Sequence, residues 1–278
     1  MKRSAGWLAE RGIEGARLDA ELLIAHALGV QRVDLYVQHD RPLQESELSA
    51  IRPLVRARGA RKPVAYILGT REFYSLTFEV DERVLIPRPE TEGLVELAVK
   101  RLEGHEAPRF VDIGTGSGCV AVAVAHERSD ATGVAIDLSS DALVVARANA
   151  ERHGVAERIR FVEGDGLAPL DDPRDAGGFD AVLANPPYIA PGDDSVAPDV
   201  HDYEPHLALY VASGDALGLV ERFAQEALRV LRPGGLLAME VGFRDGAAAV
   251  ERLLRLGYSD VAIEDDLAGI PRVVHGVR

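Results

Sequence analysis

The stretch Phe110-Val111-Asp112-Ile113-Gly114-Thr115-Gly116-Ser117-Gly118 decides the fold of this chain of 278 residues. An apolar strand runs into three alternating glycines and then into the helical pattern of residues 119–126. Glycines let the backbone approach a ligand closely, and a helix that begins beside them offers unpaired N–H groups. This order is typical of the ligand-binding turn of an open α/β sheet.

The residues around these glycines favour one kind of ligand. A dinucleotide fingerprint requires Gly-x-Gly-x-x-Gly/Ala, but Cys119 stands in its last position. Asp112 suits a ligand with an ammonium group better than one with a pyrophosphate. A tight turn that only lets the strand and the helix pack together is the alternative interpretation.

Strand–helix alternation continues on both sides of this stretch and predicts a doubly wound, mostly parallel α/β sheet. Strands are expected at 109–113, 132–137, 159–163, 179–184 and 236–241. Residues 259–264 and 271–277 are separated only by a short turn around Gly269, so these two strands must be antiparallel. The sheet should therefore end in an antiparallel hairpin.

The first part of the chain has a different pattern. Helical spacing runs from about Ser4 to Ala60, and two apolar segments follow at 64–69 and 74–80. We predict a small N-terminal helical domain at 1–63, a β-hairpin linker at 64–86 and the α/β domain at 87–278.

Composition and charge limit the possible functions. The net charge of −14 divides into +1 for residues 1–86 and −15 for the rest, whereas nucleic-acid enzymes usually carry a basic footprint. We therefore expect a protein or small-molecule substrate and no nucleic acid. No apolar run has membrane-spanning length, and the single cysteine, Cys119, fits a reducing cytoplasm. The eight histidines are scattered, so we expect no metal site.

Two acids close later strands of the predicted sheet. Asp137, 19 residues beyond Gly118, can accept both hydroxyl protons of a ribose, a feature shared by NAD and S-adenosylmethionine enzymes. Asp165-Gly166 follows the third strand, where Asp165 can accept from the exocyclic amine of an adenine. A plain turn is an equal alternative for this pair.

The run Asn185-Pro186-Pro187-Tyr188 follows the apolar strand 179–184. Two consecutive prolines donate no backbone hydrogen bonds, so the strand ends there. The Asn185 amide and the Tyr188 ring are left at the carboxyl end of a strand, where open α/β sheets bind ligands. An amide beside an aromatic ring can hold another planar NH2 group, and Asn185 and the Pro186 carbonyl are the expected acceptors of its two N–H bonds.

Taken in order, Asp-x-Gly-x-Gly-x-Gly, the strand-end acid, Asp-Gly and Asn-Pro-Pro-Tyr resemble class I S-adenosylmethionine-dependent methyltransferases with a Rossmann-like sheet. Asn-Pro-Pro-Tyr resembles the form found in enzymes that methylate adenine, cytosine or glutamine amides. Four further stretches are similar to the release factor glutamine methyltransferase (HemK/PrmC) family: 69–74, 85–92, 203–209 and 266–272. This resemblance covers nearly the whole chain.

The resemblance implies a cofactor, a substrate and a partner. The cofactor would be S-adenosyl-L-methionine, with S-adenosyl-L-homocysteine as product, and the substrate the glutamine of the Gly-Gly-Gln motif of peptide chain release factors. The product would be N5-methylglutamine, and the N-terminal domain would help dock the release factor. We expect a monomer, although the sequence itself does not give the oligomeric state. The catalytic residues would be Asn185, Pro186 and Tyr188, joined by Pro187 in substrate binding. The cofactor-binding residues would be Asp112, Gly114, Thr115, Gly116, Ser117, Gly118, Asp137, Asp165, Gly166 and Asn185.

Several alternatives stay open at this point. The alternatives are methylation of a glutamine of a ribosomal protein, methylation of an adenine of a nucleic acid, and binding of the cofactor without turnover. Arg88, Thr91 and Glu92 fit a role near the cofactor as well as an ordinary first helical turn, so they stand outside the catalytic set. Basic residues are frequent in the stretch 48–71. We favour a solvated helix face as its interpretation, and a docking surface for an acidic partner is the alternative.

Overall fold

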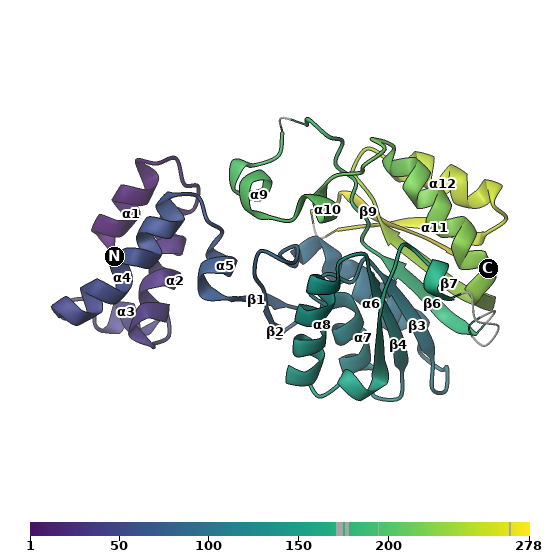
Figure 1. Cartoon of the computed structure of the whole chain (residues 1–278), viewed down its shortest axis with the longest axis horizontal. Helices are drawn as coiled ribbons and strands as arrows, with labels where there is room; N and C mark the ends of the chain where they lie inside the picture. Colours follow the sequence, from purple (N-terminus) through teal and green to yellow (C-terminus); the bar gives the residue numbers. More distant parts are fainter. Residues whose placement is uncertain (171–174, 176–177, 194, 267) are drawn as a thin grey trace. The chain divides into compact units, whose positions relative to one another are not determined.

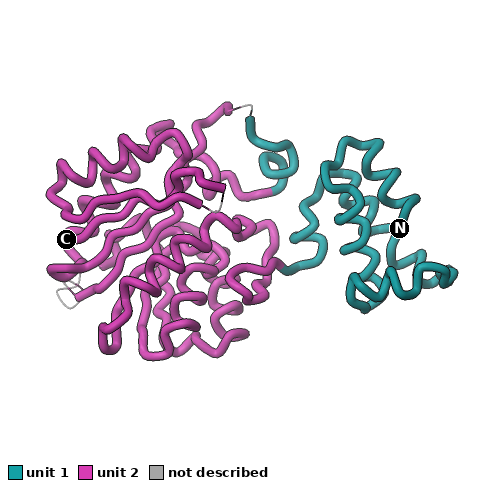
Figure 2. Tube along the Cα trace, turned by 180° about the vertical axis from the view of Figure 1, so that it is seen from behind, with its two compact units in different colours: residues 1–70, 195–203 teal, residues 71–194, 204–278 magenta. Residues whose placement is uncertain are grey.

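The structure, a computed structural model, describes residues 1–278 except 171–174, 176–177, 194 and 267. It contains two compact units, one of residues 1–70 and 195–203 and the other of residues 71–194 and 204–278 (Figure 2). Leu267 of the closing motif lies outside the described residues.

The first unit is helical. Its helices are α1 (Lys2–Ala9), α2 (Ala16–Leu28), α3 (Asp34–Val37), α4 (Glu45–Gly59), α5 (Val64–Leu68) and α9 (Pro198–Tyr203). Apolar side chains of α1, α2 and α4, among them Leu8, Ile24 and Val55, form its core. A Cβ on Gly59 would lie 2.2 Å from the Trp7 ring, so glycine lets α4 pack closely on α1.

The first apolar segment of the predicted β-hairpin linker is not a strand, because residues 64–68 form helix α5. Pro63 precedes the helix and Gly69, at φ +74°, ends it in the left-handed conformation. The hairpin of the linker lies just beyond, in β1 (Thr70–Phe73) and β2 (Leu76–Glu79). Its two turn residues, Tyr74 and Ser75, both have positive φ, as a tight two-residue hairpin turn requires.

The second unit contains a seven-stranded sheet in the order β5-β4-β3-β6-β7-β9-β8 (Figure 1). The pairs among β5, β4, β3, β6 and β7 are parallel, and β9 is antiparallel to both of its neighbours. The predicted doubly wound sheet with a closing antiparallel hairpin is therefore confirmed. Its strands are β3 (Arg109–Ile113), β4 (Thr132–Asp137), β5 (Ile159–Glu163), β6 (Phe179–Ala184), β7 (Leu231–Glu240), β8 (Ser259–Asp265) and β9 (Pro271–Val277).

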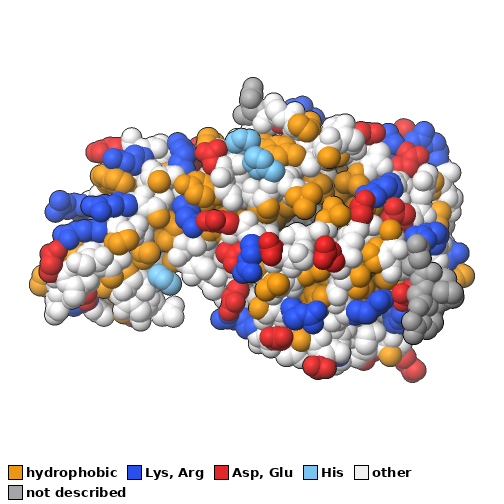
Figure 3. Space-filling view, viewed as in Figure 1, with side chains coloured by type: hydrophobic (Ala, Val, Ile, Leu, Met, Phe, Trp, Pro, Cys, Tyr) orange, Lys and Arg blue, Asp and Glu red, His pale blue; other side chains and the backbone are white. Residues whose placement is uncertain are grey.

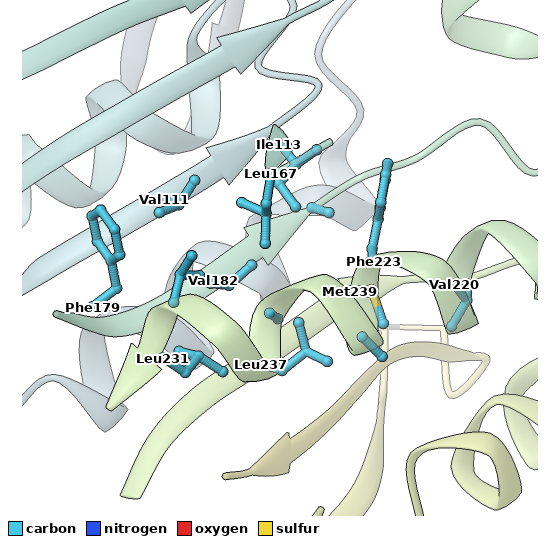
Figure 4. Close-up of a cluster of buried hydrophobic side chains, with 14 of the residues drawn as sticks. Val111, Ile113, Leu167, Phe179, Val182, Val220, Phe223, Leu231, Leu237 and Met239 are labelled. Atoms are coloured by element: carbon cyan, nitrogen blue, oxygen red, sulfur yellow. The ribbon is translucent and has the colours of Figure 1, made fainter. Parts of the chain in front are cut away.

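Helices cover both faces of this sheet. They are η1 (Pro89–Thr91), α6 (Glu92–Arg101), α7 (Cys119–Glu127), α8 (Ser140–Arg152), η2 (Ala156–Arg158), η3 (Ala168–Leu170), α10 (His206–Leu209), α11 (Ala216–Val230) and α12 (Gly246–Arg255). Val111 and Ile113 pack with α11 side chains such as Phe223 in one buried cluster (Figure 4). The intervening Asp112 points to the other face, where it accepts the N–H of Ala121 in α7.

This topology brings the functional candidates to one edge. Parallel strands end at the same edge of a sheet, so the loops after β3, β4, β5, β6 and β7 open there. β6 is buried along its whole length, which explains why all of its residues except Asp180 are apolar. The sheet therefore places Gly114, Asp137 and Asn185 on one rim.

Candidate active site

The glycine loop is held by the neighbouring strand. The N–H groups of Gly114 and Thr115 both donate to the Ile136 carbonyl, and that of Gly116 donates to Asp137 Oδ2 at 2.8 Å. Because these three donors are already used, the loop does not form a nest of free N–H groups for a pyrophosphate. This supports the expectation that the ligand is not a dinucleotide.

The glycines serve two purposes. Gly114, Gly116 and Gly118 all have positive φ, between +54° and +80°. A Cβ on Gly118 would lie 3.1 Å from Ala146, so this glycine lets α8 approach the start of α7. Above Gly114 the space is open, and the nearest atom to a Cβ there would be the Asn185 carbonyl oxygen at 4.0 Å. The glycine loop and the Asn-Pro-Pro-Tyr run are therefore direct neighbours.

Asp112 lies beneath the loop and is only 2% exposed. Its Oδ2 accepts the Thr115 hydroxyl at 2.6 Å and the Ala121 N–H at 3.2 Å. Burial raises the pKa of Asp112 to about 7 in spite of these two donors. Ser117 is equally buried, and its side chain hydrogen-bonds Cys119. The side chains of Thr115 and Ser117 thus support the loop from within.

Asp137 lies at the end of β4. It accepts the N–H of Gly116 on one oxygen and that of Ser139 on the other, at 2.8 and 2.9 Å. Burial raises its pKa. A third backbone N–H, that of Leu138, also hydrogen-bonds the group. Because a carboxylate has about four acceptor positions, it keeps capacity for a hydroxyl donor. Ser139 caps α8 by accepting the Ala142 N–H, as its sequence position predicts.

Asp165 and Gly166 lie in the loop after β5. Both oxygens of Asp165 accept from the Arg222 guanidinium of α11, at 2.9 and 2.7 Å. Gly166 has φ +57°, and a Cβ there would lie 2.5 Å from Glu226. These contacts tie the turn to α11, so much of the hydrogen-bonding capacity of Asp165 is already used.

Asn185 follows the last residue of β6. Its amide Nδ2 donates to the Thr91 hydroxyl at 3.0 Å, and that hydroxyl donates to Glu240 Oε2 at 2.7 Å. The carbonyl oxygen of the Asn185 side chain is left available as an acceptor. Backbone hydrogen bonds join Ile189 to Leu209 and Val211 just after the run, which fixes the loop exit.

Tyr188 is partly buried beside Asn185, and its hydroxyl hydrogen-bonds the Glu240 carboxylate. Burial and the neighbouring Glu240 charge raise the pKa of Tyr188 to about 12. The phenol therefore stays protonated at neutral pH and is a hydrogen-bond donor, not a base. Pro186, Pro187, Tyr188 and Glu240 also line a small pocket at this edge.

Glu240 was not predicted as a site residue, Glu204 stood only within the family-like stretch 203–209, and Thr91 and Arg88 were left outside the catalytic set. Glu204 accepts the Ile86 N–H and pairs with Arg88 at 2.6 Å, which anchors the segment before η1. Glu240 closes β7 as Asp137 closes β4, so an acid at the end of a buried strand is the signal that identifies it. Glu92 accepts the Tyr74 N–H and has a structural role.

A cavity of about 630 Å³ lies at the opposite edge, where β3, β4, β5 and β6 begin. Arg109 and Arg160 in its wall both pair with Asp175, and Arg158 donates to backbone carbonyls. Their charges are thus satisfied within the protein, and none of the candidate residues lies there. In the described parts of the chain, no three histidine, cysteine or acidic side chains gather as a metal site.

Comparisons with known proteins find relatives over nearly the whole chain. The family model described as "PrmC N-terminal domain" matches residues 2–69, and the "Methyltransferase small domain" model matches residues 94–200. The chain is 44% identical to the release factor glutamine methyltransferase of Chlorobaculum tepidum over 278 residues, covering 98% of this chain and 94% of the relative. It is 43% identical to that of Geobacter sulfurreducens, covering 98% and 93% of the two chains.

The chain belongs to the release factor glutamine methyltransferase family. The hMettl16 catalytic domain, solved in complex with MAT2A 3′UTR hairpin 1, shares the fold with a TM-score of 0.61. It is 18% identical, and the match covers 81% of this chain and 80% of that chain. Family membership makes S-adenosylmethionine the methyl donor of this methyltransferase.

The residues of the methyltransferase fit that donor. Asp137 offers two acceptor oxygens for ribose hydroxyls, and Asp112 offers a carboxylate for an ammonium group. A Cβ on Gly114, between these two acids in sequence, would meet only the backbone carbonyl oxygen of Asn185, at 4.0 Å. Carboxylates accept hydrogen bonds and attract cations, and the loop N–H groups beside them are already hydrogen-bonded. The site therefore suits the hydroxyls and the cationic group of S-adenosylmethionine better than it suits phosphates.

Among the basic residues of the stretch 48–71, Arg58 is buried and is not a surface group. Arg58 is only 7% exposed and pairs with Asp19 at 2.6 Å and with Asp199 at 3.3 Å, all within the first unit. The interpretation of this stretch as a solvated face is therefore wrong for Arg58. In the part of the chain that the structure describes, no helix has the length and hydropathy of a membrane-spanning segment.

Proposed function

We propose that the protein methylates the side-chain amide nitrogen of the glutamine in the Gly-Gly-Gln motif of peptide chain release factors. The products are N5-methylglutamine and S-adenosyl-L-homocysteine. One observation carries this assignment beyond the family match: Asn185 is tied through its own NH2 to Thr91, which leaves its oxygen for a second NH2 group. A glutamine amide presents such a group.

The chemistry needs a well-aimed nitrogen. An amide nitrogen is a weak nucleophile because its lone pair is delocalised into the carbonyl. The donor supplies a methyl group made electrophilic by its sulfonium. The Asn185 side-chain oxygen and the Pro186 carbonyl accept the two N–H bonds of the target, which aims the lone pair and favours the positive charge that develops on nitrogen.

Tyr188 and Pro187 complete the acceptor site. The two prolines hold the Pro186 carbonyl in a rigid exit from β6. The Tyr188 ring packs on the plane of the target amide, while its hydroxyl stays on Glu240. No general base is needed first, because a methylated, positively charged nitrogen is acidic enough to lose its proton afterwards.

The remaining site residues bind the donor. Asp137 accepts the two ribose hydroxyls, Asp112 accepts the ammonium group, and Asp165 shares its oxygens between Arg222 and the adenine amine. Gly114, Gly116 and Gly118 keep the loop backbone close to the ligand. Thr115 and Ser117 act by shaping the loop from below, and Gly166 by forming the turn after Asp165.

The helical region docks the release factor. In functional terms the chain divides into a docking domain (1–63), a linker of helix α5 and the β1–β2 hairpin (64–86), and a catalytic domain (87–278). This division differs from the compact units, because residues 195–203 belong to the helical unit. The enzyme acts as a cytoplasmic monomer and does not use nucleic acid as a substrate.

A nucleic-acid adenine is the strongest alternative acceptor. The surplus of acids in residues 87–278 argues against it, since such enzymes need a basic footprint. On the face drawn in Figure 3, acidic and basic side chains are intermingled over the second unit. A glutamine of a ribosomal protein shares the acceptor chemistry, so only a direct test separates it from a release factor.

Mass spectrometry of a purified release factor, after incubation with the enzyme and S-adenosylmethionine, tests the assignment. We expect the mass of one methyl group on the Gly-Gly-Gln peptide, and no methylation of a release factor whose motif glutamine is replaced by glutamate. Parallel reactions with ribosomal proteins and with DNA and RNA serve as comparisons. Methyl transfer to one of these, with an unmodified release factor, would overturn the assignment.

A further inference from the structure

A chain of buried hydrogen bonds ends on Asn185. Asn185 Nδ2 donates to Thr91 Oγ1, and Thr91 Oγ1 donates to Glu240 Oε2. Thr91 is 2% exposed and Glu240 is 1% exposed. The three residues come from the end of β6, from η1 and from the end of β7, so the chain forms only when these elements meet.

We propose that Thr91 and Glu240 are positioning residues that fix which end of the Asn185 amide faces the substrate. The proposal rests on the function assigned above, in which the Asn185 oxygen accepts an N–H of the target amide. It adds two residues to that reaction, neither of which touches the substrate.

The position of the Thr91 hydroxyl proton decides which end of the Asn185 amide faces Thr91. An ionised carboxylate only accepts hydrogen bonds, so the single proton of the Thr91 hydroxyl must point to Glu240. The hydroxyl oxygen can then only accept, and the end of the Asn185 amide that faces it must be the NH2 end. The carbonyl end is thereby turned outwards, as an acceptor.

Without the hydrogen bonds from Asn185 to Thr91 and from Thr91 to Glu240, the Asn185 side-chain amide has two orientations. The terminal torsion of an asparagine is broad and roughly two-fold, so little in the side chain itself prevents a turn. A turned Asn185 would present NH2 to the NH2 of the target, and neither group could accept from the other. An enzyme molecule with its Asn185 amide turned would therefore not aim the nitrogen of the target amide at the methyl group, even with the cofactor bound normally.

Glu240 also fixes the other side of the acceptor site, because it accepts the Tyr188 hydroxyl. Burial raises the pKa of Glu240, and the nearby charge of Glu90 adds to that rise. The hydroxyls of Thr91 and Tyr188, which donate to the carboxylate, and the positive charge of Arg272 act in the opposite direction and favour its ionised form. A buried carboxylate needs several such partners to stay ionised. One acid thus orients both side chains of the Asn-Pro-Pro-Tyr run that take part in the reaction.

Thr91→Val tests the proposal, since valine keeps the shape of threonine and removes the hydroxyl. We expect kcat for methyl transfer to fall by about 100-fold, as for the loss of one preorganised contact in an active site. The Kd for S-adenosylmethionine and the KM for the release factor should stay unchanged. Thr91→Ser, which restores the hydroxyl, should recover most of kcat.

Two further variants separate positioning from general stability. Glu240→Gln should also lower kcat without changing cofactor affinity, because a glutamine can donate to Thr91 and so reverse the chain. Tyr258→Phe removes another buried hydrogen bond, from Tyr258 to the Ala224 carbonyl, far from the chain in sequence. Because Tyr258 has no part in the hydrogen bonds of Asn185, Thr91 and Glu240, the Tyr258→Phe variant should have a lower Tm but the wild-type kcat.

A second readout does not depend on the acceptor. In NMR spectra of protein with 15N-labelled asparagine, the Asn185 side-chain NH2 should exchange with water more slowly in the wild type and Thr91→Ser than in Thr91→Val. Wild-type kcat and unchanged exchange in Thr91→Val would overturn the proposal. A wild-type enzyme that fails to methylate the release factor, with the expected exchange pattern, would instead overturn the assigned function.

Discussion

Asp112 is a buried acid whose surroundings only partly stabilise its charge. Two donors reach one of its oxygens, yet burial still raises its pKa to about 7. A carboxyl group in this state is kept ready to ionise beside a cation. That is the expected behaviour of an acid that meets an ammonium group only when the ligand is bound.

The stability of the free protein should carry the signature of this acid. The folded pKa, about 7, lies above the value of 3.8 for an unperturbed aspartate, so the folded state holds the proton more tightly. Its contribution to stability is complete below pH 3.8 and is lost as the pH rises to about 7. Relative to Asp112→Asn, wild-type unfolding free energy should fall over this window, by on the order of 4 kcal/mol.

Urea denaturation of both proteins at several pH values measures that difference. Other titrating groups are common to the two proteins and cancel in the comparison. A difference in unfolding free energy that does not change with pH would show that the folded and unfolded states hold the Asp112 proton equally tightly, so that burial does not raise its pKa.

At the scale of elements, Asn149 of α8 joins two segments that adjoin the site. Its side chain donates to the Ser117 carbonyl of the glycine loop at 2.9 Å and to the Glu79 carbonyl of β2 at 3.0 Å. Its oxygen accepts the Glu79 N–H at 2.7 Å, and the residue is fully buried. One asparagine thus holds the glycine loop, the hairpin and α8 together.

Asn149→Leu should therefore weaken both the fold and the cofactor site. It leaves the N–H and carbonyl of Glu79 without partners, which should lower stability by about 2–4 kcal/mol. The freed Ser117 carbonyl should loosen the glycine loop and raise the Kd for S-adenosylmethionine. Denaturation and calorimetric titration measure the two effects, with Val144→Ala on the exposed face of α8 as the control. An unchanged Kd would mean that the loop is held by other contacts.

Sequence patterns predicted the elements that are marked by neighbouring residues in the sequence. In β3, β4 and β6, the apolar run and the residues that end the strand are only a few positions apart in sequence, so a local pattern shows both. The segment 64–68 was misassigned because a short apolar run between Pro63 and Gly69 suits a strand or a helix equally. Thr91 and Glu240 are 149 residues apart, so only the sheet topology shows that they meet.

At the scale of the whole molecule, one ion-pair cluster unites distant parts of the chain. Arg58 of α4 binds Asp19 of α2 and Asp199 of α9, and the Tyr203 hydroxyl donates to the Ala60 carbonyl. Residues 195–203 follow the Asn-Pro-Pro-Tyr run closely in sequence but belong to the helical unit. Only residues 189–194 therefore separate the Asn-Pro-Pro-Tyr run from a segment of the helical unit.

Arg58→Met should release this connection. Two acids would lose their partner, which should destabilise the helical unit by on the order of 3 kcal/mol. Hydrogen exchange of the amides in 198–203 should then become faster, whereas Arg56→Met, an exposed neighbour on α4, should leave it unchanged. Slow exchange in Arg58→Met would show that the cluster does not hold α9.

The most direct test of the account is the rate of methyl transfer by Asn185→Ala to the Gly-Gly-Gln glutamine of a release factor, measured by mass spectrometry. Asn185 is the residue that is proposed to grip the target amide, and its side chain is not one of the main groups for the donor. We predict a fall in kcat of about 100- to 1,000-fold with little change in the Kd for S-adenosylmethionine. Wild-type rates of glutamine methylation by this variant would contradict the account.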